Sequence, residues 1–320
     1  MKSGQVSKEM QTYMVIPSVP SAILRDLYAR MLLTRLVDDY TWQLHQQGRV
    51  EFVASCRGHE AVQVGSAVCI EVGKDFTLPY YRDLGVVLTI GMTPCEVFRT
   101  YLHMQQPETQ HHHTPSSKDH NPNKQQTTLH WGYHKHNMVT GPAPVATQIL
   151  HAAGIAFACK LQKARAVTVA YCGDGAAAEP DFLEGIRFAA QHQLPAVFVC
   201  EQDCGQSDLS RWPSSLQMAT LPDGLIHQRI DGTDVIAVYI AMQTAMQHAR
   251  EGHGPVLLEM CVSRSIPDQQ PAQEDMTHWH DPLLRCQRML EAEGAWDPQW
   301  AAELYARFSL EVKRALHDAL

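Results

Sequence analysis

Two different spacings of hydrophobic residues divide this chain. Between residues 22 and 48, apolar side chains recur every three or four positions and the run ends at Gly48, which predicts an amphipathic helix. A second helix is expected at about 58–72. Residues 1–20 precede this pattern, and we interpret them as an N-terminal extension. The first part of the folded chain is therefore expected to be helical.

The aliphatic residues thin out between about 104 and 137. Histidine, glutamine, proline and asparagine replace them, and eight of the 18 histidines fall between residues 103 and 136. Such a composition predicts a long loop. Clustered histidines can bind Zn²⁺, but no cysteine or acidic ligand accompanies them at a regular spacing, so a solvated loop is favoured.

Beyond this loop, strand-like and helix-like stretches alternate. The strand candidates are the apolar runs AVTVAYC, PAVFVCE and PVLLEMCV, and helical patterns lie between them. This alternation predicts parallel strands joined by right-handed helical crossovers. Residues from 281 onward are expected to be helical again. The predicted fold class is α/β: a three-layer single domain over 21–320 with a mostly parallel sheet, N-terminal helices and a helical C-terminal tail.

Composition excludes several classes of function. The chain has 26 Lys and Arg against 34 Asp and Glu and a net charge of −8, with no basic cluster, so neither nucleic acid nor an anionic membrane surface is an expected partner. No run approaches the roughly 18 apolar residues of a membrane helix. The N-terminus lacks the apolar run of a secretory signal, so we expect a cytoplasmic protein. Nine cysteines without a C-x-x-C pair are expected to be reduced core thiols.

Candidate chemistry lies in the segment 166–205, which we interpret as a strand, a helix and a second parallel strand. Asp174 is expected to end the first strand and Asp203 the second, so both carboxylates are expected at the sheet edge where ligands bind. Gly173 and Gly175 would let the backbone bend sharply and approach a ligand closely. Carboxylates beside a helix N-terminus suit Mg²⁺ and a phosphate. The segment therefore predicts a metal–diphosphate site, although Gly-Asp-Gly alone is more often a plain turn.

The surrounding sequence resembles a known family. GDGAAAEPDFLEGIRFAAQHQLPAVFVCEQD is similar to the thiamin diphosphate motif of the alpha subunits of 2-oxo acid dehydrogenases, in which a pair of asparagines follows the Gly-Asp-Gly. The segment RGHEAVQVGSA resembles the family's G-Q-E-A segment, and PYYRDLGVVLTIGMTP resembles its Y-R-D segment. LHWG and PVATQILHAAGIAFACK match the branched-chain type. The resemblance covers about residues 25–310.

This resemblance implies a thiamin diphosphate-binding fold and the cofactors thiamin diphosphate and Mg²⁺. It implies the alpha subunit of a decarboxylating component that acts on a small-molecule 2-oxo acid, nearest to the branched-chain type, and transfers the acyl group to lipoamide. The implied partners are a beta subunit, within an alpha-two beta-two heterotetramer, and a lipoyl acyltransferase component.

The resemblance also implies roles for individual residues. Those placed against the cofactor are Tyr81 and Arg82 at the diphosphate, Ala143 and Val145 at the aminopyrimidine through backbone atoms, and Gly173, Gly175 and Ala176 along the diphosphate. The implied metal ligands are Asp174, Asp203 and the carbonyl of Gly205, and His130 aligns with a histidine near the cofactor cleft.

Two departures from the family pattern bear on function. Gln202-Asp203 replaces the asparagine pair, which adds a negative charge facing a diphosphate, and Gly205 stands where a tyrosine is usual. Asp268 stands where the family has a histidine that assists the chemistry, and these two groups donate protons at different pH. Asp268 is thus either an active-site acid or an exposed loop residue. The alternatives to a working decarboxylase subunit are a degenerate, non-catalytic scaffold or regulatory subunit, and an acetoin-type dehydrogenase alpha subunit.

Overall fold

The computed structural model describes residues 19–103, 131–142, 144–204, 221–263 and 280–320. Its centre is a five-stranded sheet in the order β1-β2-β3-β5-β4, in which every neighbouring pair is parallel. The strands are β1 (Phe76–Leu78), β2 (Thr168–Gly173), β3 (Ala196–Asp203), β4 (Ile226–Asp231) and β5 (Val256–Val262). The predicted parallel sheet is confirmed.

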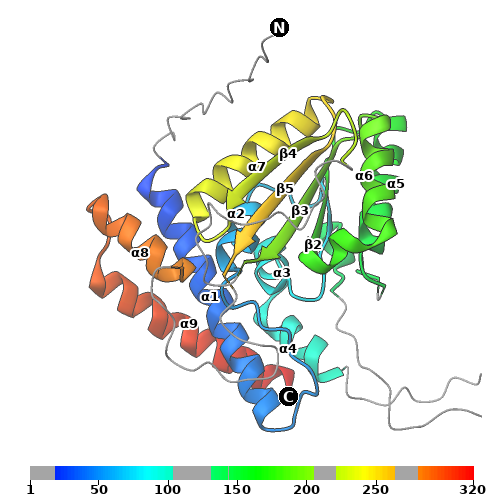
Figure 1. Ribbon diagram of the computed structural model, residues 1–320. Helices are drawn as coiled ribbons and strands as arrows, with labels where there is room; N and C mark the ends of the chain where they lie inside the picture. The colour runs from blue at the N-terminus through cyan, green and yellow to red at the C-terminus, as the bar shows by residue number, and fades with distance from the viewer. Residues whose placement is uncertain (1–18, 104–130, 143, 205–220, 264–279) are drawn as a thin grey trace, which may run out of the picture.

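Helices cover both faces of the sheet, which confirms the three-layer architecture (Figure 1). On one face lie α5 (Thr147–Leu161) and α6 (Pro180–Gln191), packed around Ile149, Phe182 and Phe198. On the other lie α2 (Glu60–Ala67), α3 (Leu84–Ile90) and α7 (Val235–Arg250), which share a second core with the alternate side chains of the same strands.

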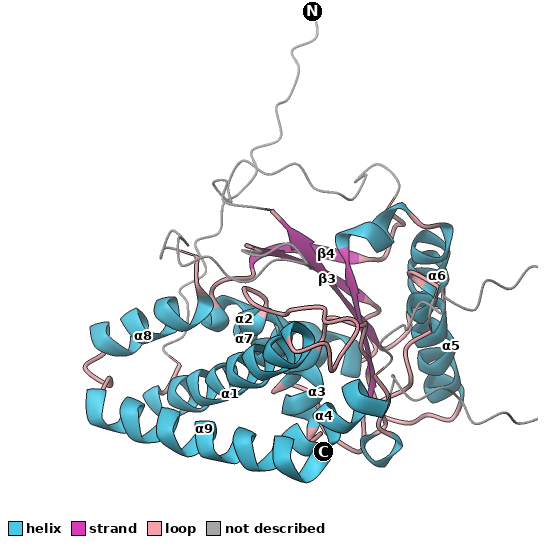
Figure 2. Ribbon diagram, turned by 90° about the horizontal axis from the view of Figure 1, so that it is seen from below, coloured by secondary structure: helices cyan, strands magenta, loops and turns pink. Residues whose placement is uncertain are grey.

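An outer group of helices lies beyond α2 and α3, farther from the sheet (Figure 2). It consists of α1 (Ser21–Gln46), α4 (Pro94–His103), α8 (Pro282–Ala292) and α9 (Pro298–Ala319). The helix predicted over 22–48 is therefore confirmed, with Gly48 just after it at a φ of 69°. The helical C-terminal tail is confirmed as two helices. No helix in the described residues is long and apolar enough to cross a membrane.

Local signals in the sequence account for several helix starts. Proline occupies the first turn of α6, α8 and α9, where its missing N–H costs nothing. Asp234 caps α7 by accepting the amides of Ile236 and Ala237, each at 3.0 Å. These caps satisfy donors that the helices themselves leave unpaired.

Other elements differ from the expectation. The helix expected at about 58–72 covers only Glu60–Ala67; the chain turns on either side of it, after the helix even though Val68, Cys69 and Ile70 continue the apolar run. Strands β1 and β4 (Ile226–Asp231) and helices α3 and α4 were not predicted. β1 has three residues, too few to show an alternation. The loop expected at 104–137 lies outside the described residues up to 130, and a 3₁₀ turn, η1 (His134–His136), follows.

Candidate active site

The ends of β2 and β3 bring the two predicted acidic residues to one edge of the sheet. Gly173, the last residue of β2, is in register with Glu201 of β3, and β3 ends at Asp203. Asp174 directly follows β2 and is exposed, while Asp203 is partly buried. The predicted placement of both carboxylates at the carboxyl edge is confirmed.

The turn after β2 differs from the expected sharp glycine bend. Gly173 has an extended backbone, with φ −89° and ψ 173°, and Gly175 is absent from the positive-φ residues of the described chain. Asp174 instead opens a 3₁₀ turn, η2 (Asp174–Ala178), and its Oδ1 accepts the Gly175 N–H at 2.8 Å. A side chain at Gly175 would meet nothing within 4 Å. Neither glycine has a left-handed backbone, so this turn does not use the conformational freedom of glycine, while the open space beside Gly175 leaves room for a ligand to approach closely.

The helix N-terminus expected beside Asp174 is displaced by this turn. α6 begins at Pro180, and its first turn contains Asp181, whose Oδ2 accepts the Thr147 hydroxyl at 2.9 Å. A carboxylate in that turn already interacts with the helix dipole. The backbone amides of η2 therefore follow Asp174 directly, whereas α6 begins six residues after it, at Pro180.

Arg82 is buried, and its side chain contacts Ser55 and Tyr81. It is 4% exposed, and its Nη1 donates to the carbonyl of Ser55 at 2.8 Å. Its guanidinium lies over the Tyr81 ring, 5.4 Å from the ring centroid. Tyr81 itself is 43% exposed, and its carbonyl accepts the Trp131 indole N–H at 3.0 Å. The Tyr81-Arg82 segment is thus fixed by backbone contacts to two distant parts of the chain.

A buried cluster around Glu201 was missed by the sequence analysis. Glu201 is 1% exposed, and its Oε2 contacts three side chains: His59 Nδ1 at 2.6 Å, the Tyr80 hydroxyl at 2.9 Å and Gln63 Nε2 at 3.3 Å. Gln63 Nε2 also donates to the Arg82 carbonyl at 3.1 Å. Glu201 therefore links α2 to the segment that holds Tyr81 and Arg82. A detectable signal existed: a glutamate within an apolar run must find buried partners.

Asp83 adds a second buried carboxyl to this cluster. It is fully buried, and it lies close enough to Glu201 to interact with its charge. Burial, followed by the negative charge of Glu201, raises the pKa of Asp83 well above its usual range. Its Oδ2 accepts the Tyr80 amide at 2.7 Å. Glu201 and Asp83 thus both hold Tyr80, two residues before Arg82: Glu201 through the tyrosine hydroxyl and Asp83 through the backbone amide.

Two buried side chains of α1, Asp38 and Arg35, hold the segment 55–60 in place. Asp38 of α1 accepts the Ser55 hydroxyl at 2.7 Å and the Cys56 amide at 3.0 Å, and burial raises its pKa to about 6. Arg35 forms ion pairs with Glu60 and, at 3.0 Å, with Asp281. These contacts connect α1 to α2 and to the start of α8.

The remaining predicted residues divide into two groups. His130, Ala143, Gly205 and Asp268 lie outside the described residues. Val145 is 55% exposed just before α5, and Ala176 is 2% exposed with its side chain in the core beneath α6. Only backbone atoms of Ala176 are thus placed to face a ligand, whereas Val145 is accessible.

The residues at this edge have the kind of oxygen ligands that a magnesium diphosphate requires. Asp174 and Asp203 lie at the ends of neighbouring strands, a side chain at Gly175 would meet nothing within 4 Å, and hard oxygen ligands are what Mg²⁺ prefers. Among the described residues, no group of three or more His, Cys, Asp or Glu side chains could hold a metal ion by itself. A metal here would therefore need backbone or ligand oxygens to complete its coordination.

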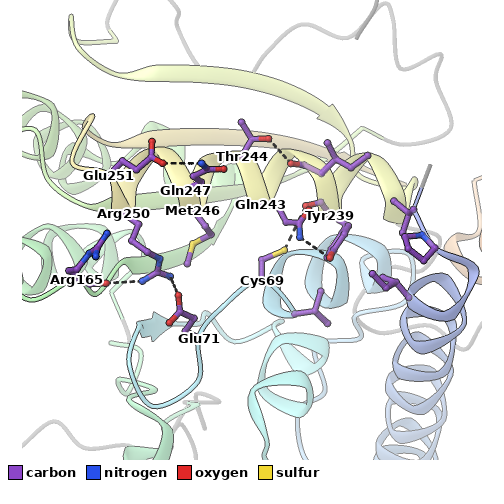
Figure 3. A pocket seen from close by; sticks show the side chains of 15 residues that line it. Cys69, Glu71, Arg165, Tyr239, Gln243, Thr244, Met246, Gln247, Arg250 and Glu251 are labelled. Atoms are coloured by element: carbon purple, nitrogen blue, oxygen red, sulfur yellow. Dashed lines mark hydrogen bonds and ion pairs between the residues drawn. The ribbon is translucent and has the colours of Figure 1, made fainter. Parts of the chain in front are cut away.

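A groove of about 820 Å³ lies elsewhere, at the opposite end of the sheet (Figure 3). It is lined by Val19, Pro20, the end of α2 and one side of α7. Arg250 at its rim binds Asp75, before β1, and the carbonyl of Arg165, before β2. These residues precede their strands, so the groove lies at the amino edge, whereas ligands of such sheets bind at the carboxyl edge.

Comparison with known proteins agrees with this geometry. A family model described as "Dehydrogenase E1 component" matches residues 28–319. The 2-oxoisovalerate dehydrogenase subunit alpha of Bacillus subtilis is 34% identical over 285 residues, covering 84% of this chain and 82% of that protein. The 3-methyl-2-oxobutanoate dehydrogenase subunit alpha of Mycobacterium tuberculosis is 31% identical, covering 94% and 79%. The pyruvate dehydrogenase E1 component subunit alpha of Staphylococcus aureus is 29% identical, covering 95% and 80%.

Proposed function

This chain belongs to the dehydrogenase E1 component family, and from that membership we propose that it is the alpha subunit of a 2-oxo acid dehydrogenase. The activity is the thiamin diphosphate-dependent oxidative decarboxylation of a 2-oxo acid, with transfer of the acyl group to lipoamide. The branched-chain type is favoured, because relatives above 30% identity from Bacillus subtilis and Mycobacterium tuberculosis are named for branched-chain 2-oxo acids.

The observation that supports this proposal most directly is the shared position of Asp174 and Asp203. Parallel strands β2 and β3 end side by side, so two carboxylates 29 residues apart in sequence lie at the same edge of the sheet. We propose that they bind Mg²⁺ with the carbonyl of Gly205, and that the metal holds the diphosphate against η2. Gly173, Gly175 and the backbone of Ala176 would line that diphosphate.

The other residues of the chain would orient and neutralise the cofactor. Arg82 supplies a buried positive charge near the diphosphate position, fixed by its bond to Ser55. Tyr81 and Val145 are exposed and would contact the cofactor from the side. Bound thiamin diphosphate supplies the electron sink for the loss of CO₂. His130 and Asp268 remain proposals for proton transfer.

The proposal includes a beta subunit as partner, because membership of this family implies one. We expect an alpha-two beta-two heterotetramer with the active site at the subunit interface, and a lipoyl acyltransferase component as the next partner. The exposed Val145 and Tyr81 at the site edge are consistent with a surface completed by another chain.

The test is calorimetric titration of thiamin diphosphate and Mg²⁺ into this chain co-expressed with its beta subunit. Binding should be lost in Asp174→Ala and kept in Glu184→Ala, which removes an exposed carboxylate from α6 in the same strand–helix–strand unit. Equal binding by wild type and Asp174→Ala would show that the cofactor lies elsewhere.

A non-catalytic scaffold or regulatory subunit is the second candidate, favoured by Gln202-Asp203 in place of the asparagine pair and by Asp268 in place of a histidine. An intact heterotetramer that binds no thiamin diphosphate would support it. A complex that binds the cofactor but cleaves acetoin instead of a 2-oxo acid would support the acetoin-type alternative, which product analysis distinguishes.

A further inference from the structure

Two cysteines meet at the carboxyl edge of the sheet, where β3 and β5 end. Cys261 of β5 is in register with Gln202 of β3, and Cys204 lies two residues beyond Gln202. Side chains two positions apart in an extended segment point to the same face, so both thiols lie on one face. The Cys204 amide donates to the Val262 carbonyl at 3.0 Å, which holds the segment after β3 against β5. The Cys204 thiol donates to the Gln202 carbonyl at 3.2 Å, and the two cysteines lie close enough to shift each other's pKa.

The surroundings of Cys261 favour a thiolate. The Arg229 guanidinium, from β4, lies 3.9 Å from its sulfur through Nη2 and contacts the buried carboxylate of Glu259 through Nε at 3.4 Å. Hydrogen bonds from Cys204 and then Arg229 lower the pKa of Cys261, although burial opposes them. Cys204 is partly exposed and gives solvent a route to the pair. A thiol with a cationic neighbour, a second thiol beside it and partial access is the arrangement of redox-active cysteines.

The other cysteines lack this combination. Cys172 and Cys200 are also a cross-strand pair, but both are fully buried, and the interaction with Cys200, followed by burial, raises the pKa of Cys172 well above its usual range. Cys69 is partly exposed, but burial raises its pKa to about 12. All nine cysteines are free thiols in this structure.

We propose that Cys204 and Cys261 form a redox-active dithiol that a hydroperoxide converts into an intramolecular disulfide and that an external thiol reduces again. This dithiol is inferred independently of the proposed decarboxylase activity, although Cys204 lies between Asp203 and Gly205, two of the proposed metal ligands. The disulfide would join the residue that follows Asp203 to β5, so that oxidation would act directly on the carboxyl edge of the sheet.

The reaction balances in two steps. The Cys261 thiolate attacks one oxygen of the hydroperoxide, the O–O bond breaks, and the leaving alkoxide or hydroxide takes up a proton, which leaves a sulfenic acid on Cys261. The Cys204 sulfur then attacks the Cys261 sulfur, the S–O bond breaks, and water leaves with the Cys204 proton. Two electrons pass from the sulfurs to the peroxide, and the products are a disulfide, an alcohol or water, and water.

The experiment treats the folded full-length chain with hydrogen peroxide, blocks the remaining thiols with iodoacetamide and maps the tryptic peptides. A linked pair consisting of residues 188–211 and 251–264 is expected, and it should disappear after dithiothreitol. Because 188–211 also contains Cys200, fragment spectra must place the bond at Cys204. This measurement needs no variant. Absence of the link while Cys69 is oxidised, or a bond to Cys200, would overturn the proposal.

Variants sharpen the test. Cys204→Ser should abolish the link and leave a sulfenic acid on Cys261 that a dimedone probe captures, whereas Cys69→Ser should leave the link unchanged. Arg229→Gln should raise the pKa of Cys261 and so reduce its thiolate fraction. Alkylation of Cys261 should slow by about tenfold for each unit by which that pKa rises, with Cys69 in the same sample as the internal reference. Equal alkylation rates in Arg229→Gln and wild type would contradict the role assigned to the guanidinium.

Discussion

Asp203 is the residue at which this chain departs most directly from the resemblance it otherwise shows. A carboxylate keeps an oxygen ligand for a metal but adds a negative charge beside a diphosphate. Asp203→Asn should therefore tighten binding of Mg²⁺ and thiamin diphosphate by about 5- to 10-fold, because one charge repulsion at a partly exposed site amounts to on the order of 1 kcal/mol. Calorimetric titration of the complex with the beta subunit measures this.

Asp203→Ala separates ligation from repulsion, since it removes the charge and the oxygen together. If Asp203 binds the metal, the alanine variant should bind more weakly than the asparagine variant. Identical affinities in the two variants would mean that the side chain is no ligand.

Residue-scale prediction worked where backbone topology alone decides position. Asp174 and Asp203 were placed correctly because parallel strands expose their carboxyl ends together, whatever the loops do. The cluster of His59, Glu201 and Asp83 was missed, because its members come from three separate segments whose packing no local pattern specifies. Gly173 and Gly175 were predicted to allow a sharp bend through the conformational freedom of glycine, whereas the structure shows no positive φ at either residue.

At the scale of elements, α1 is joined to its neighbours by one buried cation. Arg35 pairs with Glu60, whose side chain is fully buried, and with Asp281 at the start of α8. Arg35→Ala should lower the free energy of unfolding by about 3–5 kcal/mol, because a buried carboxylate is left without its partner. Urea unfolding measures the loss.

Arg30→Ala provides the matched control on the same helix. Arg30 pairs with Asp26, but both side chains are about half exposed, at 42% and 57%. Its loss should cost less than about 0.5 kcal/mol. Similar costs for both variants would show that the buried ion pair stabilises no more than a surface one.

The packing of α5 against α6 depends on a glycine. A Cβ at Gly185 of α6 would lie 2.9 Å from Ile149 Cγ2 and 3.0 Å from the Ile149 carbonyl carbon of α5. Gly185→Ala should destabilise the fold by about 1–3 kcal/mol, because backbone atoms cannot yield. Gly154→Ala, in α5, meets nothing within 4 Å and should stabilise by about 0.5–1 kcal/mol. Thermal unfolding should show a lower melting temperature for Gly185→Ala and a higher one for Gly154→Ala. A stabilising Gly185→Ala would contradict the close approach of α6 to α5 at this glycine.

Element prediction failed where tertiary contacts replace local pattern. The long periodic helix α1 and strands β2, β3 and β5 were anticipated from runs of apolar residues. β1 has only three residues and owes its place to pairing with β2 and to a bridge between Thr77 and Met138. Neither contact partner is near β1 in sequence, so no local signal marks it.

At the scale of the whole molecule, buried carboxyl groups set how stability depends on pH. Asp38 and Asp83 both have raised pKa values in the folded chain, because burial disfavours their charged forms. Groups of this kind bind protons more tightly when folded than when unfolded. Their contribution to stability is therefore complete in acid and declines as the pH rises. Asp281 has a lowered pKa and contributes in the opposite direction.

Asp38 allows this dependence to be isolated. Its pKa of about 6 in the folded chain lies above the ordinary 3.8, so the protonated carboxyl stabilises fully below about pH 4 and this stability is lost as the pH passes 6. The difference in unfolding free energy between wild type and Asp38→Asn should fall by about 3 kcal/mol between pH 4 and pH 7. Urea unfolding across this range measures it, and Asp26→Asn, which removes an exposed carboxyl from the same helix, is the control. Parallel curves for wild type and Asp38→Asn would mean that Asp38 is ionised in the folded protein and that its hydrogen bonds to Ser55 and Cys56 outweigh its burial.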